Sequence, residues 1–308
     1  MVAVFIDHAE IMHGFLDLHK GLKSYNMASN YRPGQFIYHG PRAPRLGREG
    51  LMRKKIGLIT YHYPHLKTEQ VIQRLLTKDY DFKIFALPFK PRPARKMAVL
   101  FNHRPNQIEA VAPEVLAEKH QIPYLVCAGD EDIDDSCDLY LILGGGLISP
   151  EGLKGKKIIN AHPGIIPACR GLDAFKWAVH DLKPLGVTLH YIDETVDGGE
   201  IITVVPTSVY VTDSLTTLAR RHYENEINCL ANFQEHMNHP HNPYPKLEIS
   251  ESKKRMPLAG ETALARNFES YTMRYGKGPP AANVPPHSPE EENRVARRKP
   301  ESILAWPT

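Results

Sequence analysis

The feature that most constrains the fold is an alternation of short apolar segments with amphipathic segments between residues 54 and 237. Lys54–Thr60 and Phe82–Leu87 have the length and composition of buried strands. Between them, Lys67–Lys78 carries apolar side chains at helical spacing. This alternation is typical of a mostly parallel sheet with helices on both faces, so the sequence predicts a Rossmann-like α/β fold.

The same pattern continues through the rest of this region. Further strands are expected at Pro123–Cys127, Leu139–Leu143, from Lys157 to Asn160, at Val187–Ile192 and at Ile201–Val205. Helices are expected at Ile108–His120 and from Thr212 to Met237, the latter capped by Thr212 or Asp213. Ligands of such sheets bind beyond the carboxyl ends of the strands, and both Gly144–Gly146 and Asn160 follow strands.

The two flanking segments differ from this core in composition. Residues 1–53 combine a short apolar run, a helix expected near Ile11–Leu22 and a linker rich in Gly, Pro and Arg. Residues 238–308 are rich in Pro, His and charge, and disorder is expected after about residue 276. The sequence therefore predicts an N-terminal extension over 1–53, a catalytic core over 54–237 and a C-terminal extension over 238–308.

Composition argues against several functional classes. The formal net charge of +3 is too small to indicate nucleic acid or an anionic membrane as a partner. No apolar stretch reaches the ~20 residues of a membrane helix. The four cysteines lack CxxC spacing, which argues against a zinc ribbon, and no metal is expected at the site. The N-terminus has no basic region typical of a signal peptide, which favours a cytoplasmic protein.

The clearest chemical pattern follows the strand that begins at Lys157. Asn160 and His162 are separated by one residue, so in a strand their side chains point to the same side. Pro163 stiffens the backbone that follows, and Asp197 precedes two glycines farther along the chain. An amide, an imidazole and a carboxylate are sufficient for acyl transfer, because they donate to an oxyanion, move a proton and hold charge.

Each of these residues taken alone also has an ordinary interpretation. An asparagine at a strand end or an aspartate before glycines is commonly a turn residue, and a lone histidine is more often structural. Gly144–Gly146 lacks the spacing of a nicotinamide-binding loop, so close approach of a flat ligand to the backbone explains it better. Val4–Asp7 is faintly similar to the first strand of metal-dependent nuclease domains, but no later acidic partners are evident.

The order and spacing of the whole segment resemble the formyltransferases that use 10-formyltetrahydrofolate. That family shows Asn-x-His-Pro, then Arg-Gly, then Gly-Val-Thr-x-His, and finally Asp-Gly-Gly. In this chain these motifs occupy residues 160–163, 170–171, 186–190 and 197–199. The resemblance is strongest over residues 140–205 and extends more weakly over 54–237, which implies the formyltransferase fold and 10-formyltetrahydrofolate as formyl donor.

The resemblance also implies roles for individual residues. Asn160, His162 and Asp197 correspond to the catalytic amide, imidazole and carboxylate, with the first two stabilising the oxyanion formed when an amine attacks the formyl carbon. The implied folate-binding residues are Leu143, Gly144, Gly145, Gly146, Leu147, His190, Tyr191, Ile192 and Asp193.

Substrate binding is expected to involve basic residues outside the catalytic set. The run Lys90–Lys96, with Arg104 and Arg170, has the charge needed to hold a diphosphate, and Gly171 beside Arg170 is also expected to bind substrate. A solvated positive loop is the alternative interpretation of that run. Similarity to the sugar N-formyltransferases also suggests a homodimer formed through residues 238–275.

The resemblance leaves the acceptor amine open. The turn at 60–66 contains no glycine, unlike the phosphate-binding turn of the glycinamide ribonucleotide enzymes. Residues 238–308 are shorter and richer in proline than the basic barrel of methionyl-tRNA formyltransferases, and 1–53 are shorter than the regulatory domain of the hydrolases. The favoured acceptor is a small amine, specifically an amino sugar linked to a nucleotide. An amino acid amine, the two acceptors just named, and hydrolysis of the donor by water are the alternatives.

Overall fold

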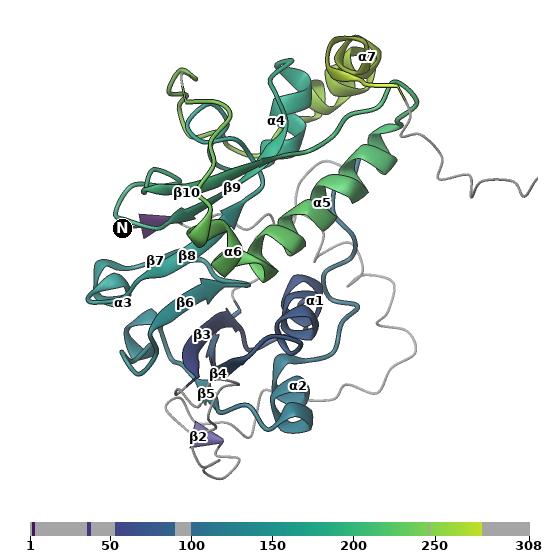
Figure 1. Cartoon of the computed structure of the whole chain (residues 1–308). Coiled ribbons are helices and arrows are strands. Elements are labelled where there is room, and N and C mark those ends of the chain that lie inside the picture. Colours follow the sequence, from purple (N-terminus) through teal and green to yellow (C-terminus); the bar gives the residue numbers. More distant parts are fainter. Residues whose placement is uncertain (1, 4–35, 38–52, 90–99, 246, 279–308) are drawn as a thin grey trace, which may run out of the picture.

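The computed structural model describes residues 2–3, 36–37, 53–89, 100–245 and 247–278. At its centre is an eight-stranded sheet in the order β10-β9-β8-β6-β3-β4-β5-β2 (Figure 1). Its strands are β2 (Phe36–Ile37), β3 (Lys54–Tyr61), β4 (Tyr80–Leu87), β5 (Tyr124–Val126), β6 (Leu139–Ile142), β8 (Ile158–His162), β9 (Gly186–Tyr191) and β10 (Ile201–Pro206).

Strands β3, β4, β5, β6 and β8 pair in parallel, whereas β9, β10 and β2 join the sheet antiparallel to their neighbours. A separate antiparallel pair joins β1 (Val2–Ala3) to β7 (Leu147–Ile148). The mostly parallel α/β sheet that the sequence predicts is therefore confirmed, and the expected strands are placed to within about two residues.

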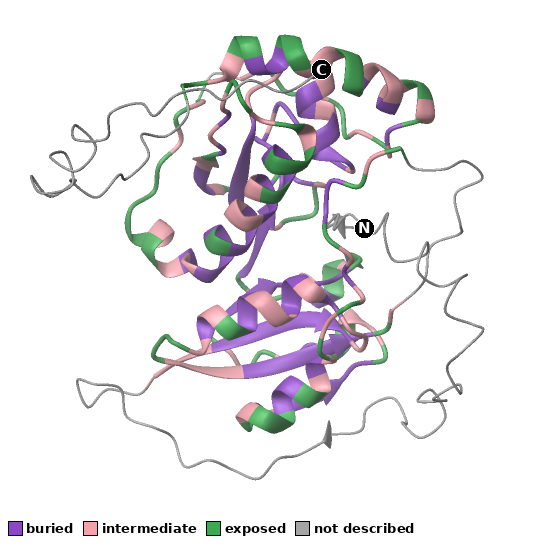
Figure 2. Ribbon diagram, turned by 90° about the vertical axis from the view of Figure 1, so that its right-hand side faces the viewer, coloured by how far each residue is buried: buried purple, intermediate pink, exposed green. Residues whose placement is uncertain are grey.

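Helices cover the two faces of the sheet unequally. The helices are α1 (Leu66–Leu75), α2 (Pro113–His120), α3 (Pro150–Leu153), α4 (Ala174–His180), α5 (Leu215–Ala231), α6 (Phe233–Asn238) and α7 (Leu258–Tyr275), with a 3₁₀ turn η3 at Asp130–Asp132. Helices α1, α2 and α5 bury apolar side chains against one face. The opposite face packs against shorter elements around η3, β7 and α3. Figure 2 shows buried residues concentrated in the strands and on the helix sides that face them.

A third apolar cluster joins α4, α7 and the start of α5, and it contains Phe175, Leu218, Leu264 and Tyr271. Between α4 and α7, Lys176 Nζ lies 2.8 Å from Glu261 Oε1, and both side chains are buried. The chain therefore continues to pack against the central fold well beyond residue 237. Among the helices of the described segments, none is both long and apolar enough to cross a membrane.

The bounds of three expected helices differ from those observed, and the helix expected over Lys67–Lys78 runs from Leu66 to Leu75. The helix expected to begin at Ile108 begins at Pro113. A proline disfavours the helical conformation of the residue before it, and Ala112 accordingly has a non-helical backbone. The helix expected from Thr212 begins at Leu215 and ends at Ala231, where the short α6 follows.

The N-terminal cap of α5 is Ser214 rather than Thr212 or Asp213. Ser214 Oγ accepts from the Thr217 amide while the Thr217 hydroxyl accepts from the Ser214 amide, which forms a capping box. Asp213 is engaged elsewhere, because its carboxylate binds Arg221 through two nitrogens and accepts from the Tyr210 amide. The helix expected near Ile11–Leu22, the linker that follows it and the tail beyond residue 278 lie outside the described residues.

Candidate active site

Four predicted site residues lie together at the carboxyl end of β8. Asn160 and His162 are on β8, and the antiparallel pairing of β9 places His190 directly opposite Asn160. Asn160 Nδ2 lies 3.4 Å from His190 Nε2. The turn after β9 places Asp197 Oδ1 3.4 Å from His162 Nδ1. All four residues are buried, with at most 2% of their surface exposed.

The hydrogen bond of His162 to the backbone decides where its protons lie. His162 Nε2 lies 2.9 Å from the Cys169 carbonyl oxygen. A carbonyl can only accept, so Nε2 carries a proton and Nδ1 is the atom that gains or loses a second one. His162 Nδ1 and Asp197 Oδ1 have no hydrogen-bond partner. His162 therefore has one fixed N–H and one exchangeable proton position that faces a carboxylate.

His190 is held neutral and orients Asn160. Burial lowers the pKa of His190 to about 4, although the charge of Asp197 acts in the opposite direction. His190 Nδ1 donates to the Tyr191 carbonyl oxygen at 3.0 Å, which leaves Nε2 as an acceptor for the Asn160 amide. The Asn160 amide thus retains one unused N–H, and its Oδ1 has no hydrogen-bond partner.

Arg170 and Gly171 hold the turn that carries Asp197. The Gly171 amide donates to Asp197 Oδ2 at 2.9 Å. Arg170 donates to the Val196 carbonyl oxygen through both Nε, at 3.0 Å, and Nη2. Asp197 itself has a left-handed backbone with φ 46, a conformation that is uncommon for residues other than glycine. The sequence reasoning assigned Arg170 and Gly171 to the substrate, and the structure places both against the Asp197 turn.

The segment after His162 is fixed by contacts from two other elements. Thr188 on β9 donates to the Gly164 carbonyl oxygen and accepts from the Ile166 amide. His222 on α5 donates from Nε2 to the Pro163 carbonyl oxygen at 3.2 Å. Burial lowers the pKa of His222 to about 4, so it is neutral and keeps its other nitrogen as an acceptor for Thr207. Sequence reasoning missed His222, whose polar side chain on the apolar face of α5 was the available signal.

The predicted folate loop, residues 143–147, follows β6 and packs against the end of β3. The amides of Leu143 and Gly144 both donate to the Ile59 carbonyl oxygen, and the Tyr61 hydroxyl donates to the Gly145 carbonyl oxygen at 2.5 Å. A Cβ on Gly144 would lie 2.8 Å from the Tyr61 ring, whereas one on Gly146 would meet nothing within 4 Å. Close packing therefore explains Gly144, and open space beside Gly146 is compatible with a ligand.

The second predicted folate segment, residues 191–193, packs against the apolar cluster that contains Ile148 of β7. The Ile192 amide donates to the Ile158 carbonyl oxygen, and Ile192 packs with the cluster that contains Ile148. Asp193 is exposed and accepts from the Thr195 amide. The structure thus places residues 191–193 beside the start of β8 and residues 143–147 after the end of β6, and their role in folate binding stays a prediction.

Arg104 lies in a buried ion cluster between α1 and α5. Its Nη2 is 2.6 Å from Glu226 Oε2, and Lys67 Nζ is 2.6 Å from Glu226 Oε1. Burial opposes ionisation of Glu226, but the charges of Arg104 and Lys67 outweigh it and lower the pKa of Glu226 to about 2. The basic run Lys90–Lys96, which was expected to act with Arg104, lies outside the described residues.

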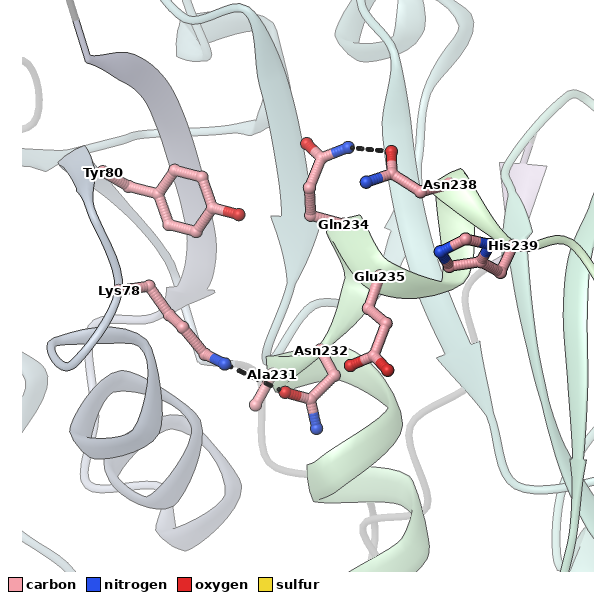
Figure 3. Close-up of a pocket in the computed structure, with 8 residues that line it drawn as sticks. All are labelled: Lys78, Tyr80, Ala231, Asn232, Gln234, Glu235, Asn238 and His239. Atoms are coloured by element: carbon pink, nitrogen blue, oxygen red, sulfur yellow. Dashed lines mark hydrogen bonds between the residues drawn. The ribbon is translucent and has the colours of Figure 1, made fainter. Parts of the chain in front are cut away.

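A pocket of about 270 Å³ lies at the other end of the sheet, between the start of β4 and the end of α5 (Figure 3). Its polar side chains bond one another, since Lys78 Nζ donates to Asn232 Oδ1 and Gln234 Nε2 donates to Asn238 Oδ1. None of the predicted site residues lines it. Across the described segments, no group of His, Cys, Asp or Glu side chains is arranged to hold a metal ion.

Comparisons with known proteins point to one family. Residues 140–233 match the model of a family described as formyl transferase. The chain is 41% identical over 68 residues to phosphoribosylglycinamide formyltransferase of Bacillus subtilis (strain 168), which covers 22% of this chain and 35% of that protein. It is 31% identical over 126 residues to formyltetrahydrofolate deformylase 1, mitochondrial, of Arabidopsis thaliana, which covers 37% and 39% respectively.

Among solved structures, a sugar N-formyltransferase from a Shewanella species superposes with a TM-score of 0.45 at 14% identity, covering 70% of this chain and 87% of that one. The match to the first two curated relatives spans about a third of their length.

Proposed function

We propose that this chain, whose residues 140–233 match the formyl transferase family, is an N-formyltransferase acting on 10-formyltetrahydrofolate and a primary amine. The observation that carries this proposal is the buried group of Asn160, His162 and Asp197 at the carboxyl end of β8. Three atoms of this group, Asn160 Oδ1, His162 Nδ1 and Asp197 Oδ1, have no hydrogen-bond partner. Buried polar atoms are rarely left in that state, so they fit a site that receives a polar reacting group.

The proposed reaction needs no covalent intermediate with the protein. The acceptor amine attacks the formyl carbon, and the carbonyl oxygen becomes an oxyanion that accepts from the unused N–H of Asn160 and from protonated His162 Nδ1. The bond between the formyl carbon and the folate nitrogen then breaks, and that nitrogen takes up the proton lost by the attacking amine. Asp197, facing His162 Nδ1, stabilises the protonated imidazole and helps to carry the amine proton through water to the folate nitrogen.

For the acceptor, we favour a nucleotide-linked amino sugar over glycinamide ribonucleotide. The amino end of the helix after the first long strand is a common phosphate site because its amides are unpaired. In this chain the Leu66 amide donates to the Gln107 carbonyl oxygen at 2.8 Å, and the Lys67 amide donates to Gln107 Oε1 at 3.1 Å. Two of the amides that a phosphate would need are therefore already used.

The turn before α1 presents aromatic rings instead. Tyr63 stacks on Phe89 with ring centroids 4.9 Å apart, and Tyr61 meets Phe89 edge-on at 5.3 Å. Tyr61 also contacts the predicted folate loop through Gly145. A flat aromatic surface beside the donor site suits a nucleobase or sugar ring better than it suits an isolated phosphate.

The test is an assay with 10-formyltetrahydrofolate and a panel of amines. The panel contains nucleotide-linked amino sugars, glycinamide ribonucleotide, methionyl-tRNA and free amino acids, and tetrahydrofolate formation is followed in each. We expect turnover with an amino sugar. Turnover only with another amine would overturn the acceptor proposal, and formate release without any amine would identify a hydrolase. Neither product under any condition would refute the proposed reaction.

Gly164 offers a separate check on the position of His162. A Cβ at residue 164 would lie 2.5 Å from the Cys169 carbonyl oxygen and 2.8 Å from His162 Nε2. Gly164→Ala should therefore separate these two atoms and lower kcat by about 100-fold, since displacement of a reacting group by about 1 Å has an effect of that size. The control is Gly278→Ala, because a Cβ there meets nothing within 4 Å. Equal kcat values for the two variants would contradict the role given to the Cys169 contact.

A further inference from the structure

We propose that residues 250–256, here called the clamp segment, are a positioning element for Asp197. This inference rests on the proposed function, since it assigns Asp197 a part in the reaction. The clamp segment lies about 55 residues beyond Asp197 in the chain and outside the residues that match the family. It reaches the site by pairing with the segment that follows the catalytic strand, residues 167–173.

Five hydrogen bonds join the clamp segment to residues 167–173. The Ser250 amide and hydroxyl both donate to the Pro167 carbonyl oxygen, at 3.0 Å and 3.1 Å. The Lys253 amide donates to the Arg170 carbonyl oxygen, and the Leu172 amide donates to the Lys253 carbonyl oxygen, both at 2.9 Å. At the end of the segment, the Met256 amide donates to Asp173 Oδ2 at 2.8 Å.

Gly171 lies between the clamp segment and Asp197. On one side it forms a parallel bridge with Lys253, and on the other its amide donates to Asp197 Oδ2. Its φ of +88 favours glycine, and a Cβ there would lie 2.3 Å from the Lys253 carbonyl oxygen. The neighbouring Arg170 binds the Val196 carbonyl oxygen in the same turn as Asp197. Two consecutive residues therefore connect the clamp segment directly to the turn that carries the carboxylate.

The clamp segment is itself anchored to the rigid part of the fold. Met256 is 2% exposed and belongs to the apolar cluster between α4 and α7. Trp177 Nε1 on α4 donates to the Lys254 carbonyl oxygen at 2.8 Å. The buried pair of Lys176 and Glu261 fixes α7 against α4 immediately beyond the segment. Because the clamp segment is held in place, a change in the backbone at Lys253 should displace Asp197 rather than move the clamp segment.

The matched pair Lys253→Pro and Lys253→Ala separates the backbone contact from the side chain. Proline removes the amide that donates to the Arg170 carbonyl oxygen, whereas alanine keeps it. Both variants lose the weak side-chain contacts of Lys253 with Trp177 and Asp181. We expect Lys253→Pro to lower kcat at least 10-fold with less than a 3-fold change in KM for the donor, and Lys253→Ala to keep the wild-type kcat.

Two further measurements distinguish positioning from a loss of stability. In the Asp197→Asn background, Lys253→Pro should lower kcat by less than 2-fold, because the group that it positions is already altered. Amide hydrogen exchange at Gly171 should be faster in Lys253→Pro than in Lys253→Ala, since the hydrogen bond to Asp197 is less well held. If Lys253→Pro does not fold, Leu172→Pro against Leu172→Ala removes the reciprocal hydrogen bond and is judged by the same criteria.

The proposal is overturned if the proline and alanine variants have equal kcat values, or if the loss of kcat is the same with and without Asp197→Asn. Amide hydrogen exchange at Gly171 is measured without any assay of turnover. If the wild-type protein forms neither a formylated amine nor formate, the proposed function fails, and faster exchange at Gly171 in the proline variant still tests the connection between the clamp segment and the Asp197 turn.

Discussion

Asp197→Asn is expected to lower kcat by at least about 100-fold while the protein still binds tetrahydrofolate, a loss typical of removing one electrostatic group from an acyl-transfer site. The substitution keeps the shape of the side chain and its ability to accept from the Gly171 amide. If that bond is kept, the new Nδ2 faces His162 Nδ1 in place of Asp197 Oδ1. An N–H at that position favours the form of His162 in which Nδ1 carries no proton. His162 then lacks the second proton that it should donate to the oxyanion.

The measurement is steady-state kcat, together with calorimetry of tetrahydrofolate binding. Glu194→Gln is the control, because it removes one negative charge from the same turn at an exposed side chain. A general effect of net charge would act on both variants alike. Near-normal turnover of Asp197→Asn would show that the carboxylate is not part of the reaction.

The prediction of where the site lies rests on local patterns and on the resemblance of their order and spacing to the formyltransferases. The alternation of strands and helices gives the parallel sheet, and strand geometry places Asn160 and His162 on one side of β8. The Asp-Gly-Gly motif marks the turn that carries Asp197. What makes this part predictable is that each step depends on residues close together in the chain.

The contacts that orient these side chains depend on strand pairings and on a chain path that local sequence patterns do not predict. Asn160 meets His190 only because β9 is antiparallel to β8 in one particular register. The hydrogen bond between His162 and the Cys169 carbonyl oxygen depends on the path of the chain after Pro163, and Gly164 permits that path. For the same reason, the sequence did not reveal that Arg170, which its charge assigned to the substrate, donates to the Val196 carbonyl oxygen, 26 residues along the chain.

The ion cluster around Glu226 could not be predicted from the sequence at all. Lys67 and Glu226 are 159 residues apart, and no local pattern in either helix marks them as partners. Their burial follows from the packing of α1 against α5, and that packing is a property of the whole fold. The cost of burying three charges is tolerated because each is paired at 2.6 Å, so the cluster should contribute strongly to stability only while it is complete.

Glu226→Gln should therefore lower the free energy of unfolding by about 3–5 kcal/mol, the usual cost of leaving buried charges without their partner. Glu224→Gln on the same helix is the control, because Glu224 pairs with Arg74 at an exposed site where such pairs contribute about 0–1 kcal/mol. Urea unfolding at pH 7 measures both. Equal effects of the two substitutions would mean that the buried cluster does not stabilise the protein.

The same cluster predicts how stability depends on pH. The pKa of Glu226 is lowered from 4.5 to about 2 in the folded protein, so its contribution is complete above about pH 4.5 and is lost as pH falls towards 2. Protonated Glu226 resembles glutamine in charge, and the difference in stability between wild type and Glu226→Gln should therefore shrink over that window. A difference that stays constant from pH 7 to pH 3 would show that the substitution acts through packing, whereas a shrinking difference assigns it to the charge that Lys67 and Arg104 require.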